Sequence, residues 1–209
     1  LDRAYVTWAP NAKWKITAGK QAYSYTRTGS LFYDNDVNLE GLSANFTTGN
    51  FFAGAFYDWL GERALSFSNV TTGTNTDSIM FGAQLGYRVP ISDSMRLTLA
   101  GTYMDFDGVQ GYNRFFGGSS FGNTTTTSSA VCNRSLAAGT ACLLSDFDII
   151  EGSADLTWSL GGKPLRMFVD YAQNMEAEIN PAANDELDTA YAVGVQFNAA
   201  SAVKGSWEF

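Results

Sequence analysis

The sequence predicts an all-β protein that forms an antiparallel transmembrane β-barrel. Three observations in the 209-residue chain support this fold class. About ten segments carry an apolar residue at every second position, which is typical of strands with one apolar face. The connections between these segments alternate between short and long. No apolar stretch reaches the roughly 20 residues that a membrane-spanning helix needs.

The clearest strand covers residues 79–89, where Ile79 and Phe81 fall on one face and Gly82 and Gln84 on the other. The same alternation predicts nine further strands over residues 4–8, 14–18, 42–46, 51–59, 97–103, 150–158, 165–171, 191–197 and 205–209. No charged residue falls in any apolar row. We therefore expect these rows to face lipid.

The connections indicate how the strands are arranged. The short ones cover residues 10–13, 48–50, 90–94, 161–164 and 199–203, and the long ones residues 20–38, 60–78, 105–148 and 173–188. In an antiparallel meander alternate connections lie at the same end of the sheet, so the tight turns gather at one end. Outer-membrane barrels have this layout, with periplasmic turns and long extracellular loops. We expect one barrel domain over residues 1–209, with the four long connections as its extracellular loops.

Aromatic residues of the apolar rows lie near the strand ends. Those near the tight turns are Trp8, Trp14, Phe46, Phe51, Tyr87, Trp158 and Phe197, and those nearer the long connections are Tyr57, Trp59, Phe81, Tyr103, Tyr171 and Tyr191. Two such belts match the aromatic girdles at the two lipid interfaces. The alternative is a large soluble β-sandwich, but sandwich connections do not sort by length in this way.

The composition excludes several function classes. The chain has no His, which removes imidazole bases, His-assisted nucleophiles and His metal sites. Its net charge of −8 argues against a nucleic-acid partner. No spacing of Ser, Lys or carboxylates indicates a catalytic group, so we expect no enzyme activity and no cofactor.

Cys132 and Cys142 are the only cysteines, and both lie in the longest connection. We expect a disulfide between them, because a metal site would need more ligands than two thiols.

Two further motifs in the connections leave alternatives open. Acidic and amide residues repeat at Asp34, Asp36, Asn38 and Glu40, like the start of a calcium loop, but the Gly and Glu that an EF-hand needs at positions six and twelve are absent. A solvated turn is the plainer interpretation, and we expect no metal site. The aromatic, glycine-rich stretch 111–118 either folds into the lumen as a constriction or shields the barrel mouth.

Three stretches near the start carry a family resemblance. They are Leu1-Asp2-Arg3-Ala4-Tyr5-Val6, Ile16-Thr17-Ala18-Gly19-Lys20, and Phe32-Tyr33-Asp34-Asn35-Asp36-Val37-Asn38-Leu39-Glu40-Gly41-Leu42. Together they resemble the interior of the Gram-negative "putative porin" family of outer-membrane proteins, with a looser resemblance over residues 191–209. Asn38-Leu39-Glu40-Gly41 stands where the family has Asn-Pro-Glu-Gly. The resemblance implies a barrel of about 16 strands and passive diffusion as the activity.

The expected topology also indicates a piece of a larger barrel. The first strand leads into a tight turn and the last strand leaves one, so both ends of the chain would lie outside the cell. Bacterial barrels normally begin and end in the periplasm. We therefore expect at least one strand before Leu1 and at least one after Phe209, and we expect that residues 1–209 alone do not make a stable barrel.

The sequence thus predicts an outer-membrane channel for ions and small hydrophilic solutes, in contact with lipid and lipopolysaccharide, and with a homotrimer as one expected assembly. The alternative is a structural barrel that sheathes or docks a partner such as a cytochrome or a surface-layer protein. The predicted pore-lining charges are Arg3, Lys15, Arg88, Arg96, Arg166, Glu151, Asp155 and Asp170. The bases lie mostly on the earlier strands and the acids on later ones, which predicts a transverse field. The long connections carry the excess acid, which predicts a modest cation preference.

Overall fold

The computed structural model describes residues 2–29, 31–32, 37–61, 77–112, 123–132, 140–182, 184–197 and 207–208. Within these ranges the chain forms strands, turns and irregular segments. No helix in them is long and apolar enough to cross a membrane. The predicted all-β class is confirmed.

Ten strands form one antiparallel sheet, in which each strand pairs with the next one along the chain. They are β1 (Ala4–Asn11), β2 (Trp14–Gln21), β3 (Leu39–Thr48), β4 (Phe51–Gly61), β5 (Ser78–Ser92), β6 (Met95–Asp107), β9 (Phe147–Leu160), β10 (Lys163–Asn174), β13 (Thr189–Phe197) and the two-residue β14 (Trp207–Glu208). Two small two-stranded sheets lie in the long connections. They pair β7 (Thr125–Thr126) with β8 (Cys142–Leu143), and β11 (Ile179–Asn180) with β12 (Asp185–Glu186).

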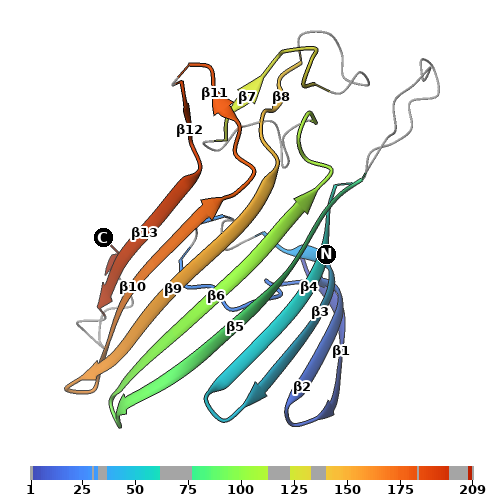
Figure 1. Cartoon of the computed structure of the whole chain (residues 1–209). Coiled ribbons are helices and arrows are strands. Elements are labelled where there is room, and N and C mark those ends of the chain that lie inside the picture. Colours follow the sequence, from blue (N-terminus) through green and yellow to red (C-terminus); the bar gives the residue numbers. More distant parts are fainter. Residues whose placement is uncertain are drawn as a thin grey trace.

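All ten predicted strands of the main sheet are present, and the predicted alternation of connections is confirmed from β1 to β13; the predicted short connection 199–203 lies outside the described residues. Only two residues separate β1 from β2, β3 from β4, β5 from β6, and β9 from β10. These turns gather at the lower end of the sheet in Figure 1, and β7, β8, β11 and β12, which belong to two of the long connections, lie at the upper end. Gly161 and Gly162 both have positive φ, 57° and 81°, as a tight turn matched to the strand twist requires.

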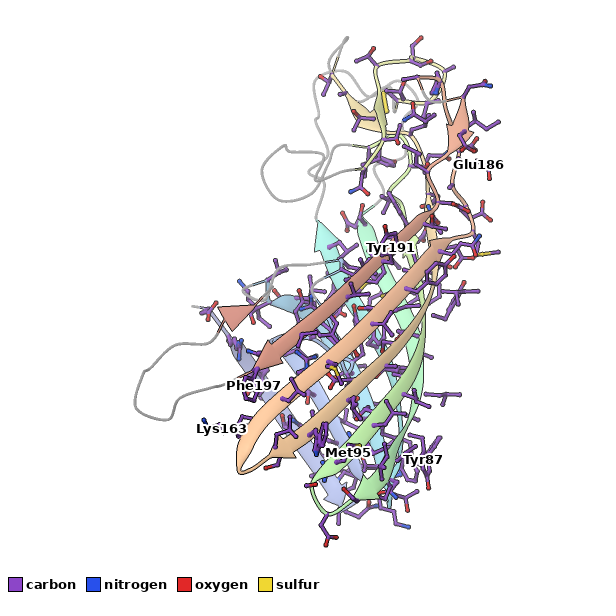
Figure 2. The ribbon with its side chains drawn as sticks, turned by 90° about the vertical axis from the view of Figure 1, so that its left-hand side faces the viewer. Tyr87, Met95, Lys163, Glu186, Tyr191 and Phe197 are labelled. Carbon is purple, nitrogen blue, oxygen red and sulfur yellow. A yellow bond between two sulfur atoms is a disulfide. The ribbon has the colours of Figure 1, made fainter. Side chains whose placement is uncertain are left out.

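The convex face of the sheet carries the apolar rows. Val6 and Tyr191 on this face are 75% and 77% exposed, and Leu85 and Val193 are also largely exposed. A β-sandwich would bury these rows against a second sheet, so their exposure contradicts that alternative and favours a lipid-facing surface. Figure 2 shows Tyr87 and Lys163 near the tight-turn end and Glu186 at the opposite end.

The sheet is open in the part of the chain that the structure describes. β1 pairs with β2 and β14 with β13, and these two outer strands are not paired with each other. Closure into a barrel and a total of 16 strands therefore stay predictions.

Three phenylalanines on the concave face each lie directly opposite a glycine of the neighbouring strand. Phe52 pairs with Gly86, Phe56 with Gly82 and Phe168 with Gly194. A Cβ atom on any of these glycines would overlap the opposite ring. The glycines therefore provide the space in which the rings lie flat along the wall.

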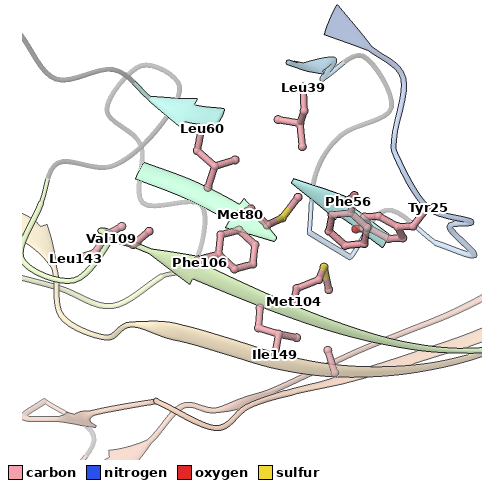
Figure 3. Packing of buried hydrophobic residues seen from close by; sticks show 11 residues of the cluster. Tyr25, Leu39, Phe56, Leu60, Met80, Met104, Phe106, Val109, Leu143 and Ile149 are labelled. Atoms are coloured by element: carbon pink, nitrogen blue, oxygen red, sulfur yellow. The ribbon is translucent and has the colours of Figure 1, made fainter. Parts of the chain in front are cut away.

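The concave face is apolar near the long connections. Buried side chains form a cluster there, shown in Figure 3: Tyr25, Leu39, Phe56, Leu60, Met80, Met104, Phe106, Val109, Leu143, Ile149 and Ala172. Met80 and Met104 have no exposed surface. The face that carries Gly82 and Gln84 in the sequence predicts a polar, small-residue interior, and for this half of the wall that prediction is wrong. The long connections fold back over the inner row and cover it.

The predicted disulfide between Cys132 and Cys142 is present, with the two Cα atoms 5.5 Å apart. Cys142 belongs to β8 and is buried, and its neighbour Leu143 joins the inner cluster. The bond therefore ties the outer part of the longest connection to a segment anchored on the wall.

We expect Gly86→Ala to lower the free energy of unfolding by about 1–3 kcal/mol, because the added methyl group displaces the Phe52 ring. Gly152→Ala is the matched control, since nothing lies within 4 Å of its Cβ position. Both glycines lie inside strands, so the change in backbone entropy is the same. Urea unfolding of the full-length protein in detergent measures both. Equal destabilisation by the two substitutions would contradict the ring-packing account.

Mass spectrometry of protein isolated without reductant should find Cys132 and Cys142 bonded. The crosslink spans ten residues. Because it lowers the entropy of the unfolded chain, it stabilises the folded loop by about 3 kcal/mol. We expect Cys132→Ser with Cys142→Ser to speed proteolysis within residues 123–146 and to leave the strands of the main sheet resistant. Two free thiols in the native protein would rule the bond out.

Candidate functional site

One segment crosses the concave face from strand to strand. We call residues 22–29, which follow β2, the inner strap. In Figure 1 this blue segment passes behind the sheet as a trace without arrows. It contacts side chains of β4, β5, β9 and β10, so it spans most of the wall.

Hydrogen bonds fasten the inner strap to successive strands. The Ser24 hydroxyl donates to both carboxylate oxygens of Asp58 on β4, at 2.9 and 3.2 Å. The Gln84 amide on β5 accepts from the Thr26 N–H at 2.9 Å and donates to the Thr26 carbonyl at 2.8 Å.

The far end of the strap is held in the same way. The Thr28 hydroxyl donates to Ser153 of β9 at 3.0 Å, and Arg166 of β10 donates to the Thr28 carbonyl oxygen. Gly29 lies beside the Asp170 carboxylate, also on β10, since a Cβ atom at Gly29 would be 3.4 Å from Asp170 Oδ2.

The spacing of these contacts follows from strand geometry. Neighbouring strands lie about 4.8 Å apart, so β4 and β10 are separated by about 19 Å along the wall. An extended chain covers about 3.3 Å per residue, so the steps from Ser24 to Gly29 span about 17 Å. A segment of this length can therefore reach from β4 to β10 only across the shorter concave side.

Aromatic contacts fix the side chains of the strap. The ring of Tyr25 stacks on Phe56 with centroids 5.0 Å apart, and Tyr23 meets Tyr25 edge-on at 6.1 Å. The Arg27 guanidinium lies 3.5 Å from the centroid of the Tyr23 ring. Thr26 is exposed on the strap, whereas Ser24 and Thr28 are buried against the wall. The strap therefore presents Thr26 to the open side of the concave face.

Two of the predicted pore-lining acids lie buried beside the strap. Asp170 is 1% exposed and Glu151 is 5% exposed. Their carboxyl groups lie close to each other, and Thr102 on β6 is directly opposite Glu151. These acids are engaged with protein groups.

A third predicted acid is paired with a predicted base. Arg166 Nη2 lies 2.5 Å from Asp155 Oδ2, and Arg166 Nε donates to the same oxygen at 2.6 Å. The two charges largely cancel, and Arg166 also holds the strap. The expected transverse field stays a prediction.

The other predicted bases divide between the two ends of the sheet. Arg3 donates to Asn38 Oδ1 at 2.7 Å, next to the start of β3 at the long-connection end. Lys15, Arg88 and Arg96 lie near the tight turns. Whether these side chains line a pore stays a prediction.

The other motifs of the long connections do not form a metal site in the described ranges. Asp34 and Asp36 lie outside the described residues, while Asn38 bonds to Arg3 and Asp2, and Glu40 is exposed. No group of three or more potential ligands that could hold a metal ion occurs among the residues described.

The aromatic stretch 111–118 is described only at Gly111 and Tyr112. Gly111 donates to the Leu143 carbonyl at 2.9 Å, and the buried Tyr112 lies at the long-connection end. Residues 113–118 lie outside the described part of the chain, so the choice between constriction and shield is open for them.

Acidic residues gather above the sheet at the long-connection end. Asp105 and Asp148 are directly opposed on β6 and β9. Burial raises the pKa of Asp146, and the negative charges of Asp105, Asp107 and Glu176 add to that effect. This end of the molecule is therefore strongly negative.

Sequence reasoning did not identify the inner strap. The signal available was the alternation of Ser24, Thr26 and Thr28 with larger side chains, but neither face of that segment is apolar. The apolar Phe56 and Leu60 in the inner row of β4 were a second signal, because they made both faces of that strand apolar.

Comparison with known proteins identifies the family. Residues 1–159 match a family profile described as "Putative porin". No curated protein and no solved structure gives a significant match. The family match extends well past the first 42 residues that suggested the resemblance, and it does not include residues 191–209. Since it covers more than half of the sequence, the chain belongs to the putative porin family.

Proposed function

We propose that the protein is an outer-membrane porin that lets ions and small hydrophilic solutes diffuse through a water-filled channel narrowed by the inner strap. The observation that carries this proposal is the strap itself, a polar segment anchored across the concave face of a membrane-type sheet. A barrel wall that only enclosed a partner would need no such crossing segment.

The convex face supports insertion into lipid. Its exposed side chains are apolar over the whole length of the strands, with Trp8 and Tyr87 near one end and Trp59 and Tyr103 near the other. Aromatic residues at both ends of an apolar band suit the two lipid interfaces. We propose that the tight turns face the periplasm and the long connections the exterior.

The remaining expectations belong to the same proposal. Closure of the sheet into a complete barrel, contact with lipopolysaccharide and a homotrimeric assembly are proposed here as properties of the whole protein. We assign it no catalytic residue and no cofactor.

Single-channel recording of the full-length protein in a planar lipid bilayer tests the proposal. We expect stepwise increases in conductance that scale with salt concentration, as a water-filled pore requires. A protein that inserts in the bilayer and does not conduct would overturn the proposal and favour a barrel that sheathes a partner.

Thr26→Cys tests the position of the strap. Both cysteines of residues 1–209 are used in the disulfide, so the new residue would be the only free thiol within these residues. We expect a bulky cationic thiol reagent to lower the conductance of each open channel in steps, because Thr26 faces the lumen. Ala55→Cys on the lipid-facing row is the matched control, and its conductance should not change. Equal responses of the two variants would contradict a lumenal strap.

A further inference from the structure

Two arginines lie side by side on the concave face, near the tight turns and away from the apolar cluster. Arg88 on β5 is directly opposite Thr98, and Arg96 on β6 is two residues from Thr98 on the same face. Such diagonal neighbours have Cα atoms roughly 7–8 Å apart, within reach of long side chains. Two like charges this close repel each other unless an anion lies between them.

Protein groups do not neutralise this pair. Among the residues that the structure describes, the one ion pair joins Arg166 to Asp155. Asp155 lies opposite Thr98, so it faces the same area, but its Oδ2 atom is held by Arg166 at 2.6 Å. Arg88 and Arg96 therefore keep a net positive charge on this part of the wall.

The orientation of Arg88 is fixed by packing. Its guanidinium carbon lies 4.4 Å from the centroid of the Phe52 ring, and Phe52 in turn occupies the space above Gly86. The ring covers one face of the guanidinium and leaves its N–H groups to bond within the plane. A planar fork of this kind matches the two oxygens of a carboxylate or phosphate group.

Hydroxyl groups complete the surroundings. Thr98 lies between the two arginines in the register, and Thr157 lies directly opposite Arg96. The Thr157 hydroxyl donates to the Arg96 carbonyl oxygen at 3.4 Å, a weak bond that an oxyanion can replace. We define Arg88, Arg96, Thr98 and Thr157 as the basic patch.

We propose that the basic patch binds the carboxylate or phosphate group of small anionic solutes on their way through the channel. The proposal rests on the proposed porin function, and it adds a solute class and a binding position at the tight-turn end of the lumen. The concave position of the patch favours a solute in the lumen over a lipid headgroup as the source of the anion.

Inorganic phosphate is the probe for the first test. Equilibrium dialysis of the full-length protein in detergent measures phosphate binding without any need for conduction. We expect Arg88→Gln with Arg96→Gln to weaken binding by about tenfold or more, as the loss of charge-assisted hydrogen bonds implies. Arg88→Lys keeps the charge but not the planar fork, so it should bind phosphate with intermediate affinity.

A matched control removes two charges from the same end of the molecule. Lys13 lies in the turn between β1 and β2, and Lys163 begins β10, both exposed and outside the basic patch. We expect Lys13→Gln with Lys163→Gln to leave phosphate binding unchanged. Binding that falls equally in both double variants would overturn the site, because net charge alone would explain it. Unchanged binding in the double arginine variant would overturn it as well.

Planar-bilayer recording gives the second readout. Phosphate added to a KCl solution should reduce the conductance of the parent channel and have little effect on the double arginine variant. The chloride-to-potassium permeability ratio should fall at least about twofold in that variant and stay unchanged in the lysine control. Phosphate binding through the arginines in a protein that does not conduct would support the site and overturn the porin function. A channel whose conductance and phosphate response do not depend on the arginines would support the porin function and overturn the site.

Discussion

The antiparallel hydrogen-bond ladder sends successive side chains to opposite faces, and both surfaces of this protein depend on that constraint. In β4 it directs Tyr57 and Trp59 outward, and Phe56 and Asp58 inward. A register slip of one residue would turn the buried Asp58 toward lipid, where an unpaired carboxylate is very costly. Because the outward residues fix the register, they also determine which side chains point inward and contact the inner strap.

The inner strap and the wall satisfy each other's polar groups. Asp58 has no exposed surface, and burial of a carboxylate is unfavourable unless donors reach it. Ser24 supplies such a donor, while Gln84 bonds to both backbone groups of Thr26, which would otherwise lack partners in this crossing segment. Removal of either side would leave buried polar atoms unsatisfied, so the strap is part of the folded wall.

Local patterns were sufficient to predict the ten strands, the two-residue turns, the exposed apolar rows and the Cys132–Cys142 bond, because each depends on neighbours in the sequence. The strap could not be predicted in this way. Its contacts join distant residues, such as Thr28 and Ser153 at a separation of 125, through small polar side chains with no periodic signal. The burial of Met80 and Met104 could not be predicted for a related reason. Alternation alone does not show whether an inner face contacts water or a returning loop.

Charge in this molecule is separated along the direction of the strands. Acids such as Asp105 and Asp148 lie at the long-connection end, whereas Arg88 and Arg96 lie near the tight turns. The two groups favour ions of opposite sign, but they act over different distances. The exposed acids act through a field that salt screens, with a Debye length of roughly 30 Å at 0.01 M and 3 Å at 1 M. The arginines act by direct hydrogen bonds to a bound oxyanion, which screening weakens less. In the proposed channel, low salt should therefore emphasise a cation preference from the exposed acids, and high salt an anion preference from the basic patch.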